Sequence, residues 1–240
     1  MQINREKGAE PLYLQLKEMV KENIKTGKYK TGELIPTELE FQKEFNISRI
    51  TARQAINELA LEGYVKRIKG KGTIVQYPRI EEPLVRIKSF TSEMKERGIE
   101  ASTKCAEITI TKAFDDVPEN LQVEKGEDIY KVRRVRCADG EPIVLFDTYF
   151  KMELNLELDN ELYYGSLYDY LHTTRGINIA KIKQHIGAAS ANSFISEHLG
   201  IKKGEPVLVV KRQSFDENGN LIEFTKGYYI AERYEYYIEI

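Results

Sequence analysis

Cysteine is scarce in this chain of 240 residues, and the shortage excludes two classes of protein. The chain contains two cysteines, Cys105 and Cys137. Two are too few for the disulfide framework of a small secreted domain, and their separation matches no common spacing of zinc ligands. We therefore expect both side chains to be buried, reduced thiols.

Long apolar runs are absent as well. No stretch approaches the roughly 20 apolar residues that span a bilayer, and the opening "MQINREKGAEPLYLQ" lacks the apolar segment of a secretory signal. A hydrophobic content of 41% and a charged content of 31% are ordinary for a globular protein. The sequence predicts a cytoplasmic protein with no membrane partner, long enough for two domains that each bury a core.

Catalytic motifs are also missing. The three histidines, His172, His185 and His198, are scattered, so they form no H-x-x-x-H pair, and the chain has no nucleophile-elbow motif. Neither cysteine has a base beside it in the sequence. We expect no catalytic residue, no bound metal and no cofactor. An enzyme stays open as an alternative class, which turnover of a ligand would reveal.

Aspartate is absent from the first third of the chain, and the charge is uneven along the sequence. Residues 1–78 contain 14 Lys and Arg, 10 Glu and no Asp, a net charge of +4, whereas the remainder carries −6. A modest basic bias suits a domain that faces phosphates, although +4 is also common on an ordinary solvated surface. The charge therefore needs a structural pattern to support it.

Three helices are predicted in this basic third. Apolar side chains recur at helical spacing over residues 11–27. Thr37 followed by Glu40 has the spacing of a capping box, which predicts the start of a short second helix. Ser48 has the side chain of an N-cap and predicts a third helix over residues 46–63.

The third helix has two contrasting faces. Ala52, Ala55, Ile56 and Leu59 form its apolar face and are expected to be buried. The opposite face is polar and free of carboxylates, and it carries Ile50, Arg53, Gln54 and Asn57, with Arg49 on its flank. Taken alone, such a face is more often just solvated surface than a binding surface.

Two β-like runs, "YVKRI" and "TIVQY", follow the third helix and are joined by "KGKG". Gly70 and Gly72 permit the tight backbone of a hairpin, so the first third predicts a winged helix-turn-helix. A lysine-rich hairpin alone is usually a surface loop. Because it follows an arginine-bearing helix, DNA binding becomes the favoured function: Arg can contact guanine in the major groove, and Lys at a wing can meet phosphate or the minor groove.

The segment "GELIPTELEFQKEFNISRITARQAINELALEGYVKRIKGKGTIV" resembles the DNA-binding domain of the GntR family of bacterial transcription regulators. This resemblance implies a double-stranded DNA operator as partner. It also implies operator contacts from Ser48, Arg49, Thr51, Arg53, Lys69, Gly70 and Lys71. Leu39 stands where many members carry an arginine, so the operator sequence cannot be taken from relatives.

The rest of the chain predicts a second domain of a different kind. Residues 78–88 contain two prolines and mixed charge and are expected to be a linker between domains at 1–77 and 89–240. Strands are predicted at 105–114, 128–138, 141–150, 180–189, 206–215 and 221–230, and shorter helices at 90–98, 165–176 and 191–200. Strands joined by tight turns favour an α+β domain on a mostly antiparallel sheet.

Two arginines in this second domain suggest an anion site. Arg134 and Arg136 stand two residues apart on one predicted strand, so both point to the same face. They could simply pair with carboxylates on neighbouring strands. The stretches "SFTSEM" and "GSLYDYL" each predict a helix start, where backbone N–H groups accept phosphate. Together these features suggest a phosphorylated or carboxylated small molecule.

Residues 89–239 resemble the UTRA effector domain found in the HutC-type subfamily of GntR regulators. The resemblance rests on "SFTSEMKERG", "VRRVRCADGEPIVLFDTYF", "GSLYDYL" and "LIEFTKGYYIAERYEY". It implies a fold like that of chorismate lyase and a phosphate held by Thr91, Arg134, Arg136, Ser166 and Tyr168. It also implies sugar contacts from Glu223 and Tyr229. Phe146 departs from the glutamate of relatives that bind amino-sugar phosphates, which suggests a different sugar.

These observations predict a homodimeric transcription regulator, expected to act as a repressor, that binds a palindromic operator and is released by a small phosphorylated sugar or a related anionic metabolite. A carbohydrate-utilisation operon is the expected target. An enzyme would turn the ligand over, and an architectural DNA-binding protein would ignore it. The effector, the operator and the target genes are not defined by the sequence.

Overall fold

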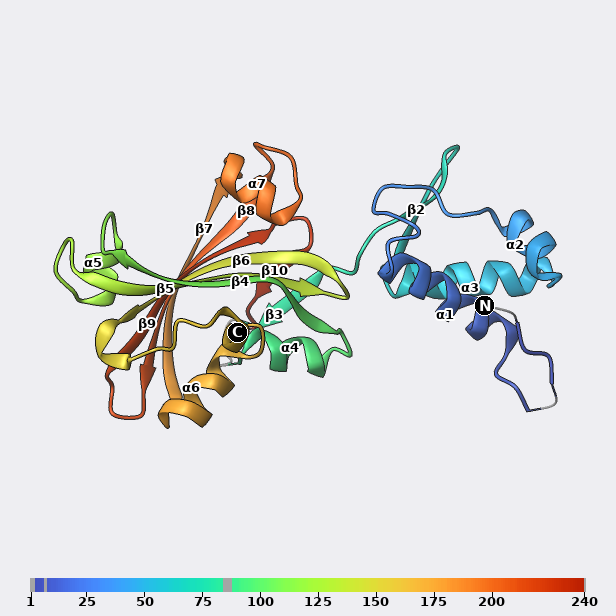
Figure 1. Ribbon diagram of the computed structural model, residues 1–240. Helices are drawn as coiled ribbons and strands as arrows, with labels where there is room; N and C mark the ends of the chain where they lie inside the picture. Colours follow the sequence, from blue (N-terminus) through green and yellow to red (C-terminus); the bar gives the residue numbers. More distant parts are fainter. Residues whose placement is uncertain (1–2, 7, 84–87, 240) are drawn as a thin grey trace. The chain divides into compact units, whose positions relative to one another are not determined.

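The computed structural model describes residues 3–6, 8–83 and 88–239 (Figure 1). The chain divides into two compact units, Met1–Ile80 and Glu81–Ile240. This boundary falls inside strand β3 (Ile80–Pro83), so part of the segment expected to be a linker is a strand. Residues 84–87 of that segment lie outside the described residues.

The first unit contains the predicted three helices and hairpin. Its elements are α1 (Leu12–Lys25), α2 (Glu38–Phe45), α3 (Arg49–Leu61) and the antiparallel pair β1 (Val65–Ile68) and β2 (Gly72–Val75). The segment before α2 also pairs with the hairpin, because Leu34 forms a bridge with Ile74 on β2. The winged helix-turn-helix expected from the sequence is confirmed.

Local capping explains why these helices begin where they do. The Thr37 side chain accepts from the Glu40 backbone N–H, and the Glu40 carboxylate accepts from the Thr37 N–H, which completes the predicted capping box. Ser48 caps α3 by accepting from the Thr51 N–H at 3.1 Å. Helix α3 ends before Gly63, whose φ of 80° is a left-handed conformation that glycine adopts without strain.

The core of the first unit is built from the apolar faces of the three helices and the hairpin. Ala52 and Ala55 are fully buried, as predicted for α3, and their small side chains allow α1 and α3 to approach closely. The largest fully buried side chains of this core are Leu16, Ile24, Phe41, Ile56 and Leu59.

The second unit is built on a six-stranded sheet in the order β4-β5-β6-β9-β8-β7, in which every neighbouring pair is antiparallel. The strands are β4 (Ala101–Lys112), β5 (Asp128–Ala138), β6 (Glu141–Lys151), β7 (Ile179–Ser190), β8 (Pro206–Asp216) and β9 (Leu221–Ile230). All six correspond to predicted strands, so the α+β class is confirmed.

Helices cover both faces of this sheet. Helix α6 (Leu167–Arg175) packs on the face that carries Val132 and Phe150. Side chains alternate between faces along a strand, so Val135 and Leu145 point to the opposite face, where α7 (Ser193–Leu199) packs. Helix α5 (Val117–Leu121) packs at the other end of that second face.

Several elements of the second unit were not predicted. These are α5, strand β10 (Tyr234–Tyr237), which pairs with β3, and two short 3-10 helices at Met152–Leu154 and Asn160–Tyr163. The predicted helix at 90–98 is shorter in the structure, α4 (Phe90–Glu96), and begins at the N-cap Ser89. Of the two cysteines, Cys137 is buried as expected, but Cys105 lies on the edge strand β4 and is only half-buried.

Within the described part of the chain, no helix is long and apolar enough to cross a membrane.

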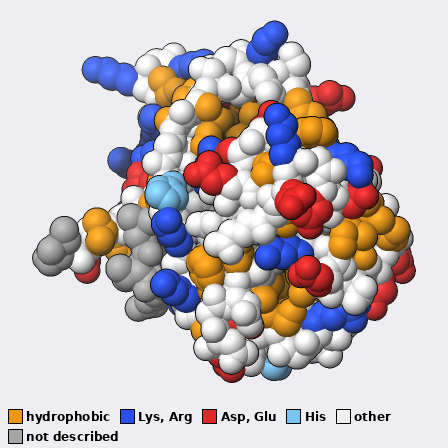
Figure 2. Space-filling view, turned by 90° about the vertical axis from the view of Figure 1, so that its left-hand side faces the viewer, with side chains coloured by type: hydrophobic (Ala, Val, Ile, Leu, Met, Phe, Trp, Pro, Cys, Tyr) orange, Lys and Arg blue, Asp and Glu red, His pale blue; other side chains and the backbone are white. Residues whose placement is uncertain are grey.

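Figure 2 views the second unit from the end that carries α5. Over the described part of that face, basic and acidic side chains are interspersed rather than gathered into a patch of one sign. A concentrated basic surface is therefore not presented there.

Candidate functional site

The polar face of α3 is exposed as the sequence predicted. The Arg49 side chain is 78% exposed, and Arg53, Gln54 and Asn57 are exposed on the same helix. Ser48 is exposed at the N-cap, and its hydroxyl lies 2.8 Å from that of the half-buried Thr51. The N-terminal turn of α3 thus offers cationic, amide and hydroxyl groups to a partner.

The wing presents the predicted basic turn. Lys69, Gly70 and Lys71 are exposed between β1 and β2, and the Lys71 N–H donates to the Ile68 carbonyl at 3.0 Å to close the turn. Gly72 has a φ of 119°, and a Cβ there would lie 2.9 Å from Cδ2 of Leu34. A side chain at Gly72 would therefore strain the wing and push it against Leu34.

A hollow lies between the N-terminal end of α2 and the wing. Four of the seven predicted operator residues line it: Arg49, Lys69, Gly70 and Lys71. The other three, Ser48, Thr51 and Arg53, lie on α3 or at its cap and do not line the hollow. Leu39, which replaces the arginine of many relatives, lies in this hollow and is exposed.

One residue of the hollow was missed by the sequence analysis. Glu38, in the first turn of α2, accepts from Arg67 Nη2 on the wing at 2.7 Å, and its second oxygen lies 3.9 Å from Arg49 Nε. The polar face of α3 is free of carboxylates in the sequence, but the fold brings this one beside it. Glu38 orients both cations and would repel a nearby phosphate.

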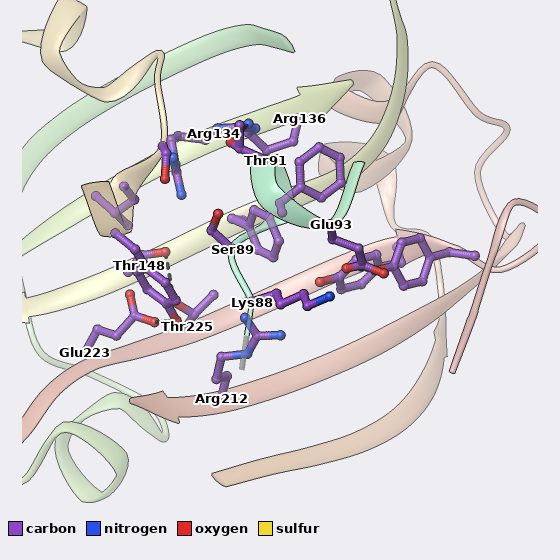
Figure 3. A pocket seen from close by; sticks show the side chains of 17 residues that line it. Lys88, Ser89, Thr91, Glu93, Arg134, Arg136, Thr148, Arg212, Glu223 and Thr225 are labelled. Atoms are coloured by element: carbon purple, nitrogen blue, oxygen red, sulfur yellow. Dashed lines mark hydrogen bonds between the residues drawn. The ribbon is translucent and has the colours of Figure 1, made fainter. Parts of the chain in front are cut away.

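The second unit contains a pocket that gathers every predicted effector residue. It contains about 530 Å³ of space, part of which is open solvent. Its walls include Thr91, Arg134, Arg136, Phe146, Ser166, Tyr168, Glu223 and Tyr229. In Figure 3, Arg134 and Arg136 lie beside Thr91, whereas Glu223 lies together with Thr148 and Thr225, away from Arg136.

Two of the three arginines of β5, Arg134 and Arg136, are buried cations that pair with no carboxylate among the described residues. Arg134 and Arg136 are 6% and 3% exposed, and both donate to the Gly165 carbonyl, at 3.2 and 2.7 Å. Arg136 also donates to the Thr91 hydroxyl at 2.8 Å. Among the described residues, no carboxylate forms an ion pair with either guanidinium, and neither Nε has a hydrogen-bond partner. The alternative of simple pairing with strand neighbours is therefore wrong.

Burial destabilises the charged form of both guanidiniums. Desolvation, followed by the like charge of Arg136, lowers the pKa of Arg134 to about 9. Desolvation lowers the pKa of Arg136 to about 10. Both groups remain charged at neutral pH, so the pocket holds two cations whose charge an anionic ligand would compensate.

The N-terminus of α6 opens onto the same pocket. Ser166 caps this helix by accepting from the Asp169 N–H at 3.3 Å. The carbonyl of the preceding residue, Gly165, accepts the hydrogen bonds from both arginines. The backbone N–H groups of Leu167 and Tyr168 are at positions with no partner inside the helix. A helix start beside two arginines brings together two independent kinds of group that attract an anion.

Tyr168 is placed differently from a simple phosphate ligand. Its hydroxyl lies 3.0 Å from both Glu223 Oε1 and Ser214 Oγ. Burial, followed by the charge of Glu223, raises the pKa of Tyr168 to about 12. Because its hydroxyl is engaged with Glu223, we expect Tyr168 to reach an anion through its backbone N–H.

The far part of the pocket offers an acceptor and an aromatic wall. Glu223 is 2% exposed, and its Oε2 has no hydrogen-bond partner among the described residues. Phe146 meets Tyr229 edge to face, with ring centroids 5.7 Å apart. Gly227 lies against both rings, since a Cβ there would be 3.0 Å from Phe146 Cε1 and Tyr229 Cε2. A ligand hydroxyl can donate to Glu223, and an apolar ligand face can rest on the rings.

Other lining residues were not found from the sequence: Lys88, Ser89, Phe90, Glu93, Thr148, Leu167, Arg212, Thr225 and Tyr234. Glu93, on α4, accepts from the Tyr234 hydroxyl at 3.2 Å and from Arg97 at 3.0 Å. Arg212 Nε donates to Gln184 at 2.8 Å. Most of them lie inside the segments that resemble the UTRA domain, but which of their side chains face the pocket depends on how distant strands and helices pack.

Comparison with known families decides what kind of protein carries these two sites. The UTRA domain model matches residues 96–235, and the model described as bacterial regulatory proteins of the gntR family matches residues 12–75. The chain belongs to the GntR family, in the branch that carries a UTRA domain. GntR regulators bind DNA, so this protein is a DNA-binding transcription regulator and not an enzyme.

Individual GntR relatives cover nearly the whole chain. The transcriptional repressor NagR of Bacillus subtilis is 33% identical over 98% of this chain and 97% of the relative. MngR of Escherichia coli, a repressor of a mannosyl-D-glycerate transport and metabolism system, is 25% identical over 95% of each chain. The crystal structure of PhnF from Mycobacterium smegmatis aligns with a TM-score of 0.66 and 25% identity, covering 95% of this chain and 98% of PhnF.

Proposed function

We propose that this GntR regulator represses a carbohydrate-utilisation operon in the cytoplasm and is released from a palindromic operator by a small phosphorylated sugar or related anionic metabolite. The observation that carries the proposal is the pair of buried guanidiniums, Arg134 and Arg136, with unpartnered Nε atoms beside the start of α6. The sugar-related name of the relative MngR supports the carbohydrate assignment.

In this proposal the phosphate binds between Thr91, Arg134, Arg136, Ser166 and the backbone N–H of Tyr168. Bidentate contact with a guanidinium and helix N–H groups is the arrangement that phosphate favours. The ligand displaces the carbonyl of Gly165 as the group that both arginines contact. Charge compensation of two buried cations then favours the ligand-bound state.

The sugar lies toward Glu223, Phe146 and Tyr229. Glu223 Oε2 accepts a sugar hydroxyl, and the rings of Phe146 and Tyr229 contact a C–H face of the sugar. Phe146 cannot accept a hydrogen bond from a hydroxyl or amide. This favours a sugar or glycoside phosphate over an amino-sugar phosphate.

At the operator, two protomers of a homodimer place their winged units on half-sites about one helical turn apart. Arg49 and Arg53 contact bases or phosphates in the major groove, with Ser48 and Thr51 hydroxyls on phosphate. Lys69, Gly70 and Lys71 of the wing contact the backbone or the minor groove. All of these residues except the half-buried Thr51 are exposed, which supports the assignment.

Release follows from the position of Thr91 on α4, the first helix after the connection to the DNA-binding unit. Arg136 donates to Thr91, so a phosphate that binds both groups changes how α4 is held. Because α4 follows that connection directly, its displacement changes the spacing of the two winged units. A differential affinity of about 3 to 5 kcal/mol is enough to shift such an equilibrium from bound to released.

The test uses the full-length protein and a panel of sugar phosphates, sugar acids and inorganic phosphate. A ligand that binds raises the unfolding temperature by mass action, and the same ligand is then added to the protein bound to DNA from its own upstream region. We expect at least one sugar phosphate to raise the melting temperature and release the DNA. The proposal is overturned if ligands that raise the melting temperature leave DNA binding unchanged.

A further inference from the structure

Ile50 is an exposed aliphatic side chain among the polar side chains on the exposed face of α3. It is the second residue of α3 and is 79% exposed. Its neighbour Arg49 is 78% exposed, and Arg53 and Gln54, one turn further along the helix, are exposed as well. An isoleucine here therefore lies among hydrogen-bond donors.

The fold of the first unit does not explain this residue. The buried face of α3 is made by Ala52, Ala55, Ile56 and Leu59, and Ile50 is not a member of that core. A β-branched side chain loses rotamer freedom in a helix and has a lower helix propensity than alanine or leucine. At an exposed position, no burial offsets this loss.

The wing identifies which end of α3 faces DNA. Arg49 lines the same hollow as Lys69, Gly70 and Lys71, so the N-terminal turn of α3 and the basic wing form one continuous surface. In helix-turn-helix proteins the N-terminal residues of the recognition helix reach the base edges. Ile50 lies in that turn.

Among the groups that base edges display in the major groove, the C5 methyl of thymine is the apolar one. We propose that Ile50 contacts this methyl, so that the operator carries a thymine at one fixed position of each half-site. Ile50 is then a specificity-determining residue for the DNA that this regulator binds. The proposal rests on DNA binding by the winged unit and is independent of the effector.

The first experiment replaces thymine by uracil, which removes the methyl and keeps the base pairing. Duplexes selected from a random library by the full-length protein serve as operator, and each thymine is replaced in turn. Loss of one buried methyl weakens binding about fourfold at one position of a half-site, and about fifteenfold when both half-sites are changed. Equal binding of every uracil-substituted duplex overturns the proposal.

The second experiment assigns the methyl contact to Ile50. Ile50→Ala binds the thymine operator about fourfold more weakly per half-site and no longer distinguishes thymine from uracil at that position. Leu61→Ala is the matched control, because Leu61 is 82% exposed at the opposite end of the same helix. It keeps the full preference for thymine.

Retention of the uracil penalty by Ile50→Ala overturns the assignment. Circular-dichroism melting shows whether that variant is folded. If Ile50→Ala is unfolded, Ile50→Val provides a milder test, because it removes a single methylene. Ile50→Val is expected to retain part of the thymine preference. Loss of the whole preference in Leu61→Ala also contradicts the proposal, since it would place the contact at the other end of the helix.

Discussion

The two units of this regulator hold the side chains proposed to be functional in opposite environments. Arg49 and Arg53 lie exposed on α3, and removing either leaves the core of the first unit untouched. Arg134 and Arg136 lie buried on β5, with no carboxylate partner among the described residues. Contacts to DNA can therefore change without cost to the fold, whereas the pocket residues determine both ligand binding and stability.

The largest expected effect comes from the buried cations. In the proposed site Arg134 bonds to the ligand phosphate, so Arg134→Met is expected to lower the effector affinity by tenfold to more than a hundredfold, as for charge-assisted hydrogen bonds. Replacing an unpaired buried cation by an apolar side chain also raises the free energy of unfolding without ligand, by about 1 to 4 kcal/mol. Calorimetric titration and thermal melting measure the two changes.

Arg133→Met is the matched control on the same strand. Arg133 points to the opposite face of the sheet and is paired with Asp147 at 2.7 Å. Breaking that pair lowers the stability and leaves effector binding intact. An equal loss of stability in both variants would contradict the distinction between the paired and the unpaired arginine.

Gly227→Ala tests the packing of the aromatic wall. The added methyl lies 3.0 Å from Phe146 Cε1 and Tyr229 Cε2, and such overpacking costs about 1 to 3 kcal/mol. Gly187→Ala, on β7, meets nothing within 4 Å and is expected to keep the parent stability. Chemical denaturation measures both. Similar denaturation midpoints for the two variants would show that Phe146 and Tyr229 shift to accommodate the added methyl without loss of stability.

Arg53→Ala weakens operator binding by about 1 to 3 kcal/mol if Arg53 contacts a base edge, with the melting temperature unchanged. Lys69→Ala at the wing instead makes the dependence of log affinity on log salt less steep, by the amount expected for the loss of one phosphate contact. Anisotropy titrations over a range of salt concentrations separate the two. Unaltered binding of Arg53→Ala would remove Arg53 from the operator contacts.

Glu38→Gln is expected to have the smallest effect. Its ion pair with Arg67 is partly exposed, with side chains 23% and 41% accessible, so the stability is expected to change by less than about 1 kcal/mol. Operator affinity rises at low salt because a carboxylate near phosphates has been neutralised, and the gain disappears as salt increases. Weaker binding at every salt concentration would mean that the orientation of Arg49 and Arg67 matters more than the repulsion.

Much of the fold was predictable because its signals are local. The Thr37 and Glu40 capping box, the Ser48 cap and the alternation along β5 depend on residues close together in sequence. Strand β10 was missed because it is short and forms only by pairing with β3. Helix α5 has a single turn and no periodic pattern to reveal it.

At the two sites as well, residues marked by local spacing were predicted from the sequence, and contacts between distant segments were not. Arg134 and Arg136 were found because two positions on one strand share a face. That Glu38 approaches Arg67, and that Glu93 meets Tyr234, depends on how distant segments pack, which no spacing in the sequence records. The buried state of the arginines likewise follows from the helices that cover the sheet.

The central claim is that the pocket and the operator are coupled, and coupling between two binding equilibria is reciprocal. The most direct measurement is a calorimetric titration of the effector into the full-length protein, first alone and then saturated with operator DNA. The account predicts weaker effector binding in the presence of DNA, by the same factor by which the effector weakens DNA binding. Equal effector affinities in the two titrations would contradict it.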